Sequence, residues 1–300
     1  MNLKTVCTDL SSSKFQSDEQ AAIQALKVIK FIAQKSYTTS QRQCEKELMD
    51  TKEQLIQATP NNPCLQNSLK FVFYDTHSLN VRSYQDKIIA HVQLALAYFT
   101  SSHKVIAKLG ERKIKSGMVV YTHAYSISVI QSLKEAKSAG KNFLVYCTET
   151  RPLFSGRVTA KALAQAGIPV TLVVDTAMSY AISKADIILL GADMILPDGK
   201  VLGALGYDII ATLGKQQVVP FYICSQAWKY NHKGIEKMEV SLKTTSEKII
   251  WDAVPKRVKI ENPPYAIIPS DAVSGIISEL GIYQPESCIA EIKARYPSIL

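Results

Sequence analysis

Apolar residues recur at helical spacing in the first third of the chain. They form one stripe along the segment that follows Ser17, and Gln20 lies three residues after that serine. A serine with a glutamine at this distance has the form of a capping box, so a helix is predicted to begin here. The stripe consists of Ala22, Ile23, Leu26, Ile29 and Ala33.

Two further helices are predicted before the pattern changes. Residues 41–58 are highly polar and end at the turn residues of 59–63, Thr-Pro-Asn-Asn-Pro. Residues 81–115 carry apolar positions at helical spacing, with a break expected near Ser101 and Ser102. No glycine precedes Gly110, which agrees with long helices because glycine is unfavourable inside them and useful in tight turns.

The pattern changes after Gly117. Short apolar runs rich in β-branched residues now alternate with helical stretches. Continuous apolar runs indicate strands that are buried on both faces, which requires helices on both sides of a parallel sheet. The runs lie at 118–121, 143–146, 169–174, 187–190 and 218–223, and the helical stretches at 125–139, 156–166, 178–183 and 204–213.

This pattern predicts a chain of two parts. Residues 1–116 are expected to form an N-terminal helical domain, and residues 117–300 a Rossmann-like α/β domain with a mostly parallel sheet. Within the second part, residues 271–280 are predicted to form an amphipathic helix, and a last helix is predicted after Pro285. The sequence contains no linker rich in proline or serine and no internal repeat.

The composition is that of an ordinary globular protein. Of the 300 residues, 47% are apolar and 20% are charged, which excludes a disordered or collagen-like chain. No stretch of about 18 consecutive apolar residues is present, and the N-terminus has no apolar signal-peptide core. We therefore expect a soluble, cytoplasmic protein without membrane contact.

The charge balance adds one question about partners. A net charge of +9 and a pI near 9.1 are compatible with a polyanion or with an acidic protein surface. The densest basic run, 104–115, is interrupted by apolar residues at helical spacing, which favours a solvated helix face instead. Because no nucleic-acid recognition motif accompanies this run, direct contact with nucleic acid is not expected.

Metal and redox chemistry lack their sequence signals. The six cysteines and five histidines are spread along the chain without a CxxC, HxxxH or HExxH pair. Such close pairs are needed because the ligands of one ion, or the two thiols of one redox centre, must converge. We therefore expect no metal ion and no cofactor.

Polar residues follow four of the predicted strands. Ligands of an open parallel sheet bind beyond the carboxyl ends of its strands, so these junctions form the candidate site. Helix N-termini and an arginine can bind a phosphate, and carboxylates can accept hydrogen bonds from hydroxyl groups, so the set suits a small anionic polyol. The candidate ligand-binding residues are Thr122, His123, Arg151, Ser155, Asp175 and Asp193.

A purely structural role is the alternative for the same residues. Arg151 would then pair with Glu149 or Asp175 to fix the loops, and Asp175 would cap the helix that follows it. His123 stands alone beside a strand end, where a general-base role is weighed against a structural one. The GxGxxG, GxxxxGK[ST] and GxSxG motifs of dehydrogenases, P-loop NTPases and α/β-hydrolases are absent.

These junctions resemble those of one protein family. The segments are Thr-His-Ala-Tyr-Ser at 122–126, Tyr-Cys-Thr-Glu-Thr-Arg-Pro at 146–152 with Ser155-Gly156, Val-Val-Asp at 173–175, and Gly-Ala-Asp at 191–193 followed by Asp198-Gly199. They are similar to the family that unites the alpha, beta and delta regulatory subunits of translation initiation factor 2B, archaeal relatives, and isomerases of methylthioribose 1-phosphate and ribose 1,5-bisphosphate. The resemblance is dense over residues 117–230, weaker over 264–285, and closest to the alpha subunit.

Departures from the isomerase pattern bear on function. The resemblance puts the isomerases' catalytic cysteine at Ala124 and their aspartate at Asp193. Their Asn-Lys-Ile-Gly-Thr run, which holds the sugar and phosphate, corresponds to Gly-Ala-Leu-Gly-Tyr at 203–207, beginning with Gly203-Ala204. Their N-terminal phosphate loop, which contains glycine, has no counterpart. A methyl group cannot transfer the proton that an isomerase moves, and Cys147 is expected to be a buried thiol rather than a substitute.

The resemblance therefore implies a non-catalytic regulatory subunit of the initiation factor 2B exchange complex, or a homologue of one. Asp193 would be vestigial, and a sugar-phosphate or nucleotide pocket would be retained. The implied partners are a second copy or related subunits, through the α/β domain, and initiation factor 2, through the helical domain. The alternatives are a phosphosugar aldose-ketose isomerase with a rearranged site and a phosphosugar sensor outside translation, because the loop at 148–152 is closer to the enzymes' version.

Overall fold

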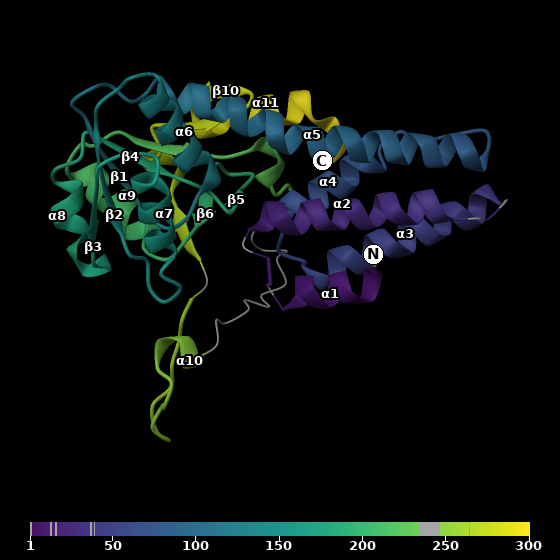
Figure 1. Ribbon diagram of the computed structural model, residues 1–300, viewed down its shortest axis with the longest axis horizontal. Coiled ribbons are helices and arrows are strands. Elements are labelled where there is room, and N and C mark those ends of the chain that lie inside the picture. Colours follow the sequence, from purple (N-terminus) through teal and green to yellow (C-terminus); the bar gives the residue numbers. More distant parts are fainter. Residues whose placement is uncertain are drawn as a thin grey trace. The chain divides into compact units, whose positions relative to one another are not determined.

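The computed structural model describes residues 2–300 except residues 13, 16, 37, 39, 235–246 and 264 (Figure 1). The chain forms two compact units, each of which is discontinuous in sequence. The first comprises Met1–Ser101, Trp228–Tyr230 and Lys293–Leu300. The second comprises Ser102–Ala227 and Asn231–Ile292.

The first unit is built from helices. They are α1 (Leu3–Ser11), α2 (Asp18–Lys35), α3 (Gln41–Ala58), α4 (Pro63–Val72) and the first part of α5 (Val81–Glu111). Each of the first four follows a residue whose side-chain oxygen accepts a backbone N–H of the first turn; these residues are Asn2, Ser17, Ser40 and Asn62. The helices predicted after Ser17 and over 41–58 are confirmed, whereas α1 and α4 have no counterpart in the sequence prediction.

Helix α5 corrects one expectation. It runs without interruption for 31 residues, so the break predicted near Ser101 and Ser102 is wrong. The Ser101 hydroxyl donates a hydrogen bond to the Tyr98 carbonyl oxygen, at 3.2 Å between the oxygens. A serine that bonds to the preceding turn in this way is tolerated inside a helix, which is why the local polar pair does not end it.

An aromatic cluster in the first unit brings together residues that are far apart in the sequence. The Trp228 ring stacks on the ring of Tyr98 with 3.9 Å between centroids, and it lies 5.2 Å from the ring of Phe71. The Asn67 amide donates to the carbonyl oxygens of Trp228 and Tyr230 at 2.9 and 2.7 Å. Three residues from late in the sequence are thereby fixed among the helices of the first unit.

The second unit contains a seven-stranded sheet in the order β10-β9-β7-β4-β1-β2-β3. All neighbouring strands are parallel except β9 and β10. The strands are β1 (Val119–Thr122), β2 (Leu144–Thr148), β3 (Val170–Val173), β4 (Ile187–Leu190), β7 (Phe221–Cys224), β9 (Gly275–Ser278) and β10 (Gly281–Tyr283). A smaller antiparallel sheet pairs β5 (Met194–Ile195), β6 (Val201–Gly203) and β8 (Ala266–Ile268).

Helices cover both faces of the larger sheet. They are α6 (Ile127–Ser138), α7 (Ser155–Ala164), α8 (Met178–Ile182) and α9 (Tyr207–Gln216). The chain also forms α10 (Glu247–Ile250) and α11 (Pro285–Arg295). Val120, Val145 and Leu189 pack with residues of α5, α6 and α7 in one buried cluster. On the next position of β4, Ile188 meets α9, where a Cβ added to Gly214 would lie 2.8 Å from Ile188 Cδ1. The burial on both faces that the continuous apolar runs predicted holds for the central strands, whereas the edge strand β3 is partly exposed. The Rossmann-like α/β fold is confirmed.

The predicted helix over 271–280 is wrong. Residues 275–278 form the fully buried strand β9, which pairs in parallel with β7 through the register Ile223↔Ile276. Val273, Ile276, Ile277 and Leu280 have helical spacing, but Ile276 and Ile277 are also adjacent β-branched residues, which suit a strand. Pairing with an existing strand and burial of β-branched side chains decided between two structures that the local pattern allows.

The strand order determines where a ligand site is expected. From β1 the chain moves outward through β2 and β3, and then returns to place β4 on the other side of β1. The carboxyl ends of β1 and β4 therefore flank a topological switch point, where crevices form in open α/β sheets. In the described part of the chain, no helix is long and apolar enough to span a bilayer.

Candidate functional site

The connection from β1 to α6 carries the first group of candidates. Thr122 ends the strand and is buried, and the next two residues, His123 and Ala124, are buried as well. Ala124 has the left-handed value φ = +60°, which is uncommon for a residue with a side chain. Its N–H donates to Thr150 Oγ1 at 3.0 Å, and its carbonyl oxygen accepts from Thr159 Oγ1 at 2.6 Å. Two hydrogen bonds thus hold a costly backbone conformation at the end of β1.

His123 is engaged at both ring nitrogens. Nε2 lies 2.9 Å from the Leu205 carbonyl oxygen, which can only accept, so Nε2 carries the proton and donates it. Nδ1 then accepts from the hydroxyl of Thr148. Burial lowers the pKa of His123 and favours the neutral ring, although the nearby Asp175 acts in the opposite direction. In this geometry His123 ties β1 to β2 and to the loop before α9, and neither nitrogen is available as a general base.

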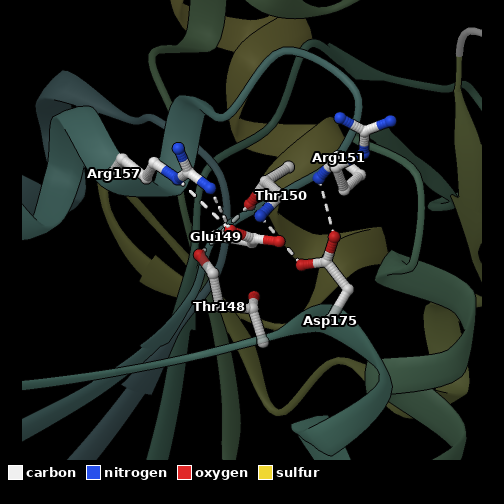
Figure 2. A network of polar contacts seen from close by, with 6 residues as sticks. All are labelled: Thr148, Glu149, Thr150, Arg151, Arg157 and Asp175. Carbon is white, nitrogen blue, oxygen red and sulfur yellow. Dashed lines mark hydrogen bonds and ion pairs between the residues drawn. The ribbon is translucent and has the colours of Figure 1, made fainter. Parts of the chain in front are cut away.

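Asp175 orders the loop between β2 and α7 (Figure 2). It follows β3, and its two carboxylate oxygens accept the backbone N–H groups of Thr150 at 2.8 Å and Arg151 at 2.6 Å. Thr150 also has a left-handed φ of +62°. The carboxylate therefore fixes two consecutive peptide units, one of them strained. This is a loop-fixing role of the kind weighed from the sequence, but its partners are backbone groups.

The two arginines of this loop differ in their contacts. Arg157 binds Glu149 Oε2 through Nη2 at 2.6 Å and Nε at 3.2 Å, and its guanidinium lies 3.8 Å from the centroid of the Phe154 ring. Arg151 has no carboxylate partner among the described residues. Its Nη2 lies 3.4 Å from the Ile250 carbonyl oxygen, and its guanidinium lies 4.9 Å from the centroid of the same Phe154 ring. Figure 2 shows its guanidinium pointing away from Asp175. The structural alternative weighed from the sequence paired the Arg151 side chain with Glu149 or Asp175. In the structure Glu149 pairs with Arg157, and Asp175 binds the backbone of Arg151.

Helix α7 begins directly at this loop. Ser155 is its first residue, and the preceding Phe154 has a left-handed φ of 55° and makes no side-chain cap to the first turn. A Cβ on Gly156 would lie 1.8 Å from the Thr148 carbonyl oxygen, so only glycine lets the helix start this close to β2. The N-terminus of α7, the exposed Arg151 and the half-buried Ser155 therefore adjoin one another along the chain.

The end of β4 supplies Asp193. Its N–H donates to the Leu202 carbonyl oxygen at 2.9 Å, so the residue is fixed at the start of the smaller sheet. The negative charge of its carboxylate acts on the phenol of Tyr207. Burial and this neighbouring charge both raise the pKa of the Tyr207 phenol, which is therefore neutral. Gly191, at the end of the same strand, packs against Ser126 so closely that a Cβ would lie 2.6 Å from the hydroxyl oxygen.

Gly203 and Tyr207 occupy the space between these strand ends. Tyr207 is 3% exposed, and a Cβ on Gly203 would lie 2.1 Å from its Cε2 atom. The Tyr207 ring also meets His123 edge-on, with 5.9 Å between ring centroids. The sequence reasoning saw only the groups that are missing from residues 203–207. The filling of that space by Tyr207 was missed, because it depends on the distance between β6 and the first turn of α9, which the residue pattern does not give.

Cys147 is placed as expected. It lies within β2, and burial raises the pKa of its thiol to about 12, so it is protonated at neutral pH. Among the described residues, no three acidic, cysteine or histidine side chains are grouped so that they could hold a metal ion.

The candidates thus fall into two groups. One group, at the ends of β1 and β4, contains Thr122, His123 and Asp193. The other, in the loops after β2 and β3, contains Arg151, Ser155 and Asp175. Thr148 and Thr150 connect the two groups through their hydrogen bonds to His123 and Ala124.

Comparisons with known proteins give the family of this chain. A ribose 1,5-bisphosphate isomerase of Methanocaldococcus jannaschii is 31% identical over 264 residues, which cover 87% of this chain and 85% of that protein. A putative translation initiation factor eIF-2B subunit 2-like protein of Pyrococcus furiosus is 30% identical over 241 residues, covering 80% of this chain and 82% of that one.

Solved structures show the same fold. The translation initiation factor eIF-2B of Pyrococcus horikoshii OT3 matches with a TM-score of 0.81 and 24% identity, covering 96% of this chain and 98% of that one. The tetrameric eIF2B-beta2-delta2 complex of C. thermophilum contains a chain that matches with a TM-score of 0.74 and 16% identity, covering 97% and 94%. The sequence model of the initiation factor 2 subunit family matches residues 14–285, and the chain belongs to this family.

Proposed function

We propose that this protein binds a phosphorylated pentose at the carboxyl edge of its larger sheet. The observation that carries the proposal is the fixed loop after β2, in which Asp175 binds two peptide N–H groups and leaves the Arg151 guanidinium without a carboxylate partner among the described residues. A preformed loop with an available guanidinium beside a helix N-terminus suits a phosphate group. The relatives named ribose 1,5-bisphosphate isomerase support this alternative better than the regulatory-subunit role expected from the sequence.

Different residues are proposed to bind different parts of the ligand. Arg151 and Ser155 bind the phosphate, and Asp175 holds their loop in place. The Asp193 carboxylate accepts hydrogen bonds from the hydroxyl groups of the sugar, and the Thr122 hydroxyl donates to them or accepts from them. His123 supports these residues and does not bind the ligand, because both of its ring nitrogens already form hydrogen bonds within the protein.

Turnover of the ligand is expected to be slow or absent. Moving a proton between adjacent carbons needs a positioned acid and base, and the loss of one such group costs about 10²–10⁴ in rate. Ala124 contributes a methyl group, Cys147 is a buried and protonated thiol, and His123 has no available nitrogen. Asp193 is the remaining carboxylate at the switch point.

Calorimetric titration of the full chain with ribose 1,5-bisphosphate, methylthioribose 1-phosphate and ribose 5-phosphate tests the proposal. We expect binding of at least one of them, weakened about 10–100-fold in Arg151→Ala because a charge-assisted hydrogen bond is lost. Arg112→Ala, which removes another exposed arginine of the same unit, is the matched control. Absence of binding by every sugar phosphate would overturn the proposal. Turnover that Asp193→Asn abolishes would replace it with an active isomerase.

An assembly of several chains is also proposed. The family member in the solved complex assembles with a related subunit, as the name of that complex states. We propose a homodimer, or a heteromer with related chains, through the α/β unit of a cytoplasmic protein. Light scattering on the purified protein gives the mass of the assembly, and a monomer at micromolar concentration would contradict it.

A regulatory subunit of an initiation factor 2B complex is the second candidate. The methyl group at Ala124 and the filled space at Tyr207 favour it, because they remove groups that turnover needs while leaving the fold intact. In that case the helical unit contacts initiation factor 2. Co-purification of initiation factor subunits with the tagged chain supports this candidate, and their absence together with sugar-phosphate binding supports the first.

A further inference from the structure

The Tyr207 ring and a side chain at position 203 cannot both be accommodated. Any side chain at Gly203 would overlap the tyrosine ring, since the nearest ring atom would lie 2.1 Å from a Cβ. Tyr207 is in turn 3% exposed, so its ring has no open space into which it could retreat. The ring is therefore a fixed part of the wall between the ends of β4 and β6.

The contacts of the ring place it at the switch point. It meets the imidazole of His123 edge-on, with 5.9 Å between the ring centroids, and burial and the negative charge of Asp193 raise the pKa of its phenol. His123 is fixed by its hydrogen bonds to Thr148 and to the Leu205 carbonyl oxygen, so the imidazole that contacts the Tyr207 ring cannot move aside. The Tyr207 side chain thus fills space that would otherwise belong to the crevice expected at the switch point.

The charges on the two sides of the crevice differ in sign. The loop after β2 contributes Arg151 and Arg157, of which Arg157 is paired with Glu149. The segment 201–214 contains no basic residue, and its one charged residue is Asp208, in the first turn of α9. The lysines at the two ends of this segment, Lys200 and Lys215, are paired with Asp198 and Asp271. The segment therefore offers no basic group without a carboxylate partner, which disfavours a phosphate there.

We infer that Tyr207 is a specificity-determining residue that closes one side of the site to an anionic group, so that the ligand is a pentose carrying a single phosphate held at the Arg151 loop. The inference rests on the proposed function, because it presumes that a sugar phosphate binds at this edge. It adds that the number of phosphates is selected by the volume of one side chain.

The test is calorimetric titration of the full chain with ribose 5-phosphate and ribose 1,5-bisphosphate. We expect the monophosphate to bind about 10–200-fold more tightly than the bisphosphate, the range that a fitted pocket provides. Tyr207→Ala opens the closed side and should reduce this preference at least about tenfold, whereas Tyr207→Phe keeps the ring and should retain it. Tyr180→Ala, which removes an exposed tyrosine of α8, is the control.

Circular dichroism of each variant shows whether it folds, and Tyr207→Leu replaces the alanine variant if the larger cavity prevents folding. Equal affinity of the wild-type chain for both ligands, or an unchanged preference in the opened variant, would overturn the inference while leaving sugar-phosphate binding in place. Binding that appears only in the opened variants would support the closing role of Tyr207 and contradict the proposed function. Absence of binding in every variant would overturn both.

Discussion

The carboxylate of Asp175 binds Arg151 through its backbone N–H, at 2.6 Å, and leaves the guanidinium of the same residue pointing away. An ion pair between the two side chains would have neutralised the arginine. The observed bond has the opposite effect, because it orders the peptide while the cation remains available to a ligand. Glu149 forms its ion pair with Arg157 and not with Arg151, so the Arg151 guanidinium remains available to a ligand.

The first prediction concerns this bond. Asp175→Ala leaves the N–H groups of Thr150 and Arg151 without their acceptor, so we expect a loss of about 1–3 kcal/mol in the free energy of unfolding. Urea denaturation measures it. Asp198→Ala, which removes an exposed carboxylate paired with Lys200, should change stability by less than about 1 kcal/mol. Equal effects of the two substitutions would contradict a special role of Asp175.

The second prediction concerns the strained backbone at Ala124. A left-handed conformation costs an alanine about 1–2 kcal/mol relative to glycine, so Ala124→Gly should be neutral or stabilising by up to about 1 kcal/mol. The same substitution inside α7, Ala160→Gly, should destabilise by about 0.5–1 kcal/mol. Opposite signs in thermal unfolding support the strain. A clear loss of stability in both variants would contradict it.

The third prediction is a dependence of stability on pH. Burial lowers the pKa of His123 in the folded chain below its ordinary value of 6.5, so the unfolded chain binds the proton more readily. The contribution of His123 to stability is therefore fully present above pH 6.5 and is lost as the pH falls from that value through the folded-state pKa. The charge of Asp175 and the hydrogen bond to the Leu205 carbonyl oxygen act in the opposite direction and reduce this lowering of the pKa without reversing it.

Unfolding by urea between pH 7.5 and 5 measures this contribution. His123→Gln should flatten the decline of stability in that range, whereas His77→Gln, at an exposed histidine, should leave it unchanged. If the slope of the His123 variant equals that of the wild-type chain, the buried neutral imidazole is not its source.

The fourth prediction concerns the thiols. Five of the six cysteines are buried in the folded chain, and Cys7 alone is half-buried. Burial raises the pKa of Cys147 and Cys224 to about 12, which suppresses the reactive thiolate. A chromogenic disulfide reagent at pH 8 should therefore react with one thiol of the native chain and with all six in denaturant. Cys7→Ser should remove the native reaction, and a second fast thiol would indicate an activated cysteine in the site.

The sequence predicts those parts of the fold that depend on local pattern. The continuous apolar run at 187–190 predicts β4 with its observed bounds, and Ser17 marks the start of α2. The strand β9 is not predictable in this way, because its apolar spacing fits a helix equally well and only pairing with β7 decides. Position in the sheet, rather than local preference, is the missing information.

The candidate site, like the fold, is predictable from the sequence only in part. That Arg151 and Asp175 lie near each other follows from their places after neighbouring parallel strands, but the sequence cannot say that the backbone makes the bond. The pairing of Arg157 with Glu149 needed the path of the loop and the start of α7. The overlap between Gly203 and Tyr207 depends on how far β6 lies from the first turn of α9, a distance that no residue pattern encodes.

The three residues around Trp228 have a practical consequence for anyone who wishes to express half of this protein. Trp228 is 1% exposed and rests on Tyr98 and Phe71, although it lies more than a hundred residues after both in the sequence. No single cut therefore separates a complete helical piece from a complete α/β piece. A fragment that ends near residue 101 would expose the apolar surface that Trp228 covers, and the remaining fragment would carry an orphaned indole. To obtain the helical unit alone, residues 228–230 and the segment 293–300, which also belongs to that unit, have to be joined to residues 1–101.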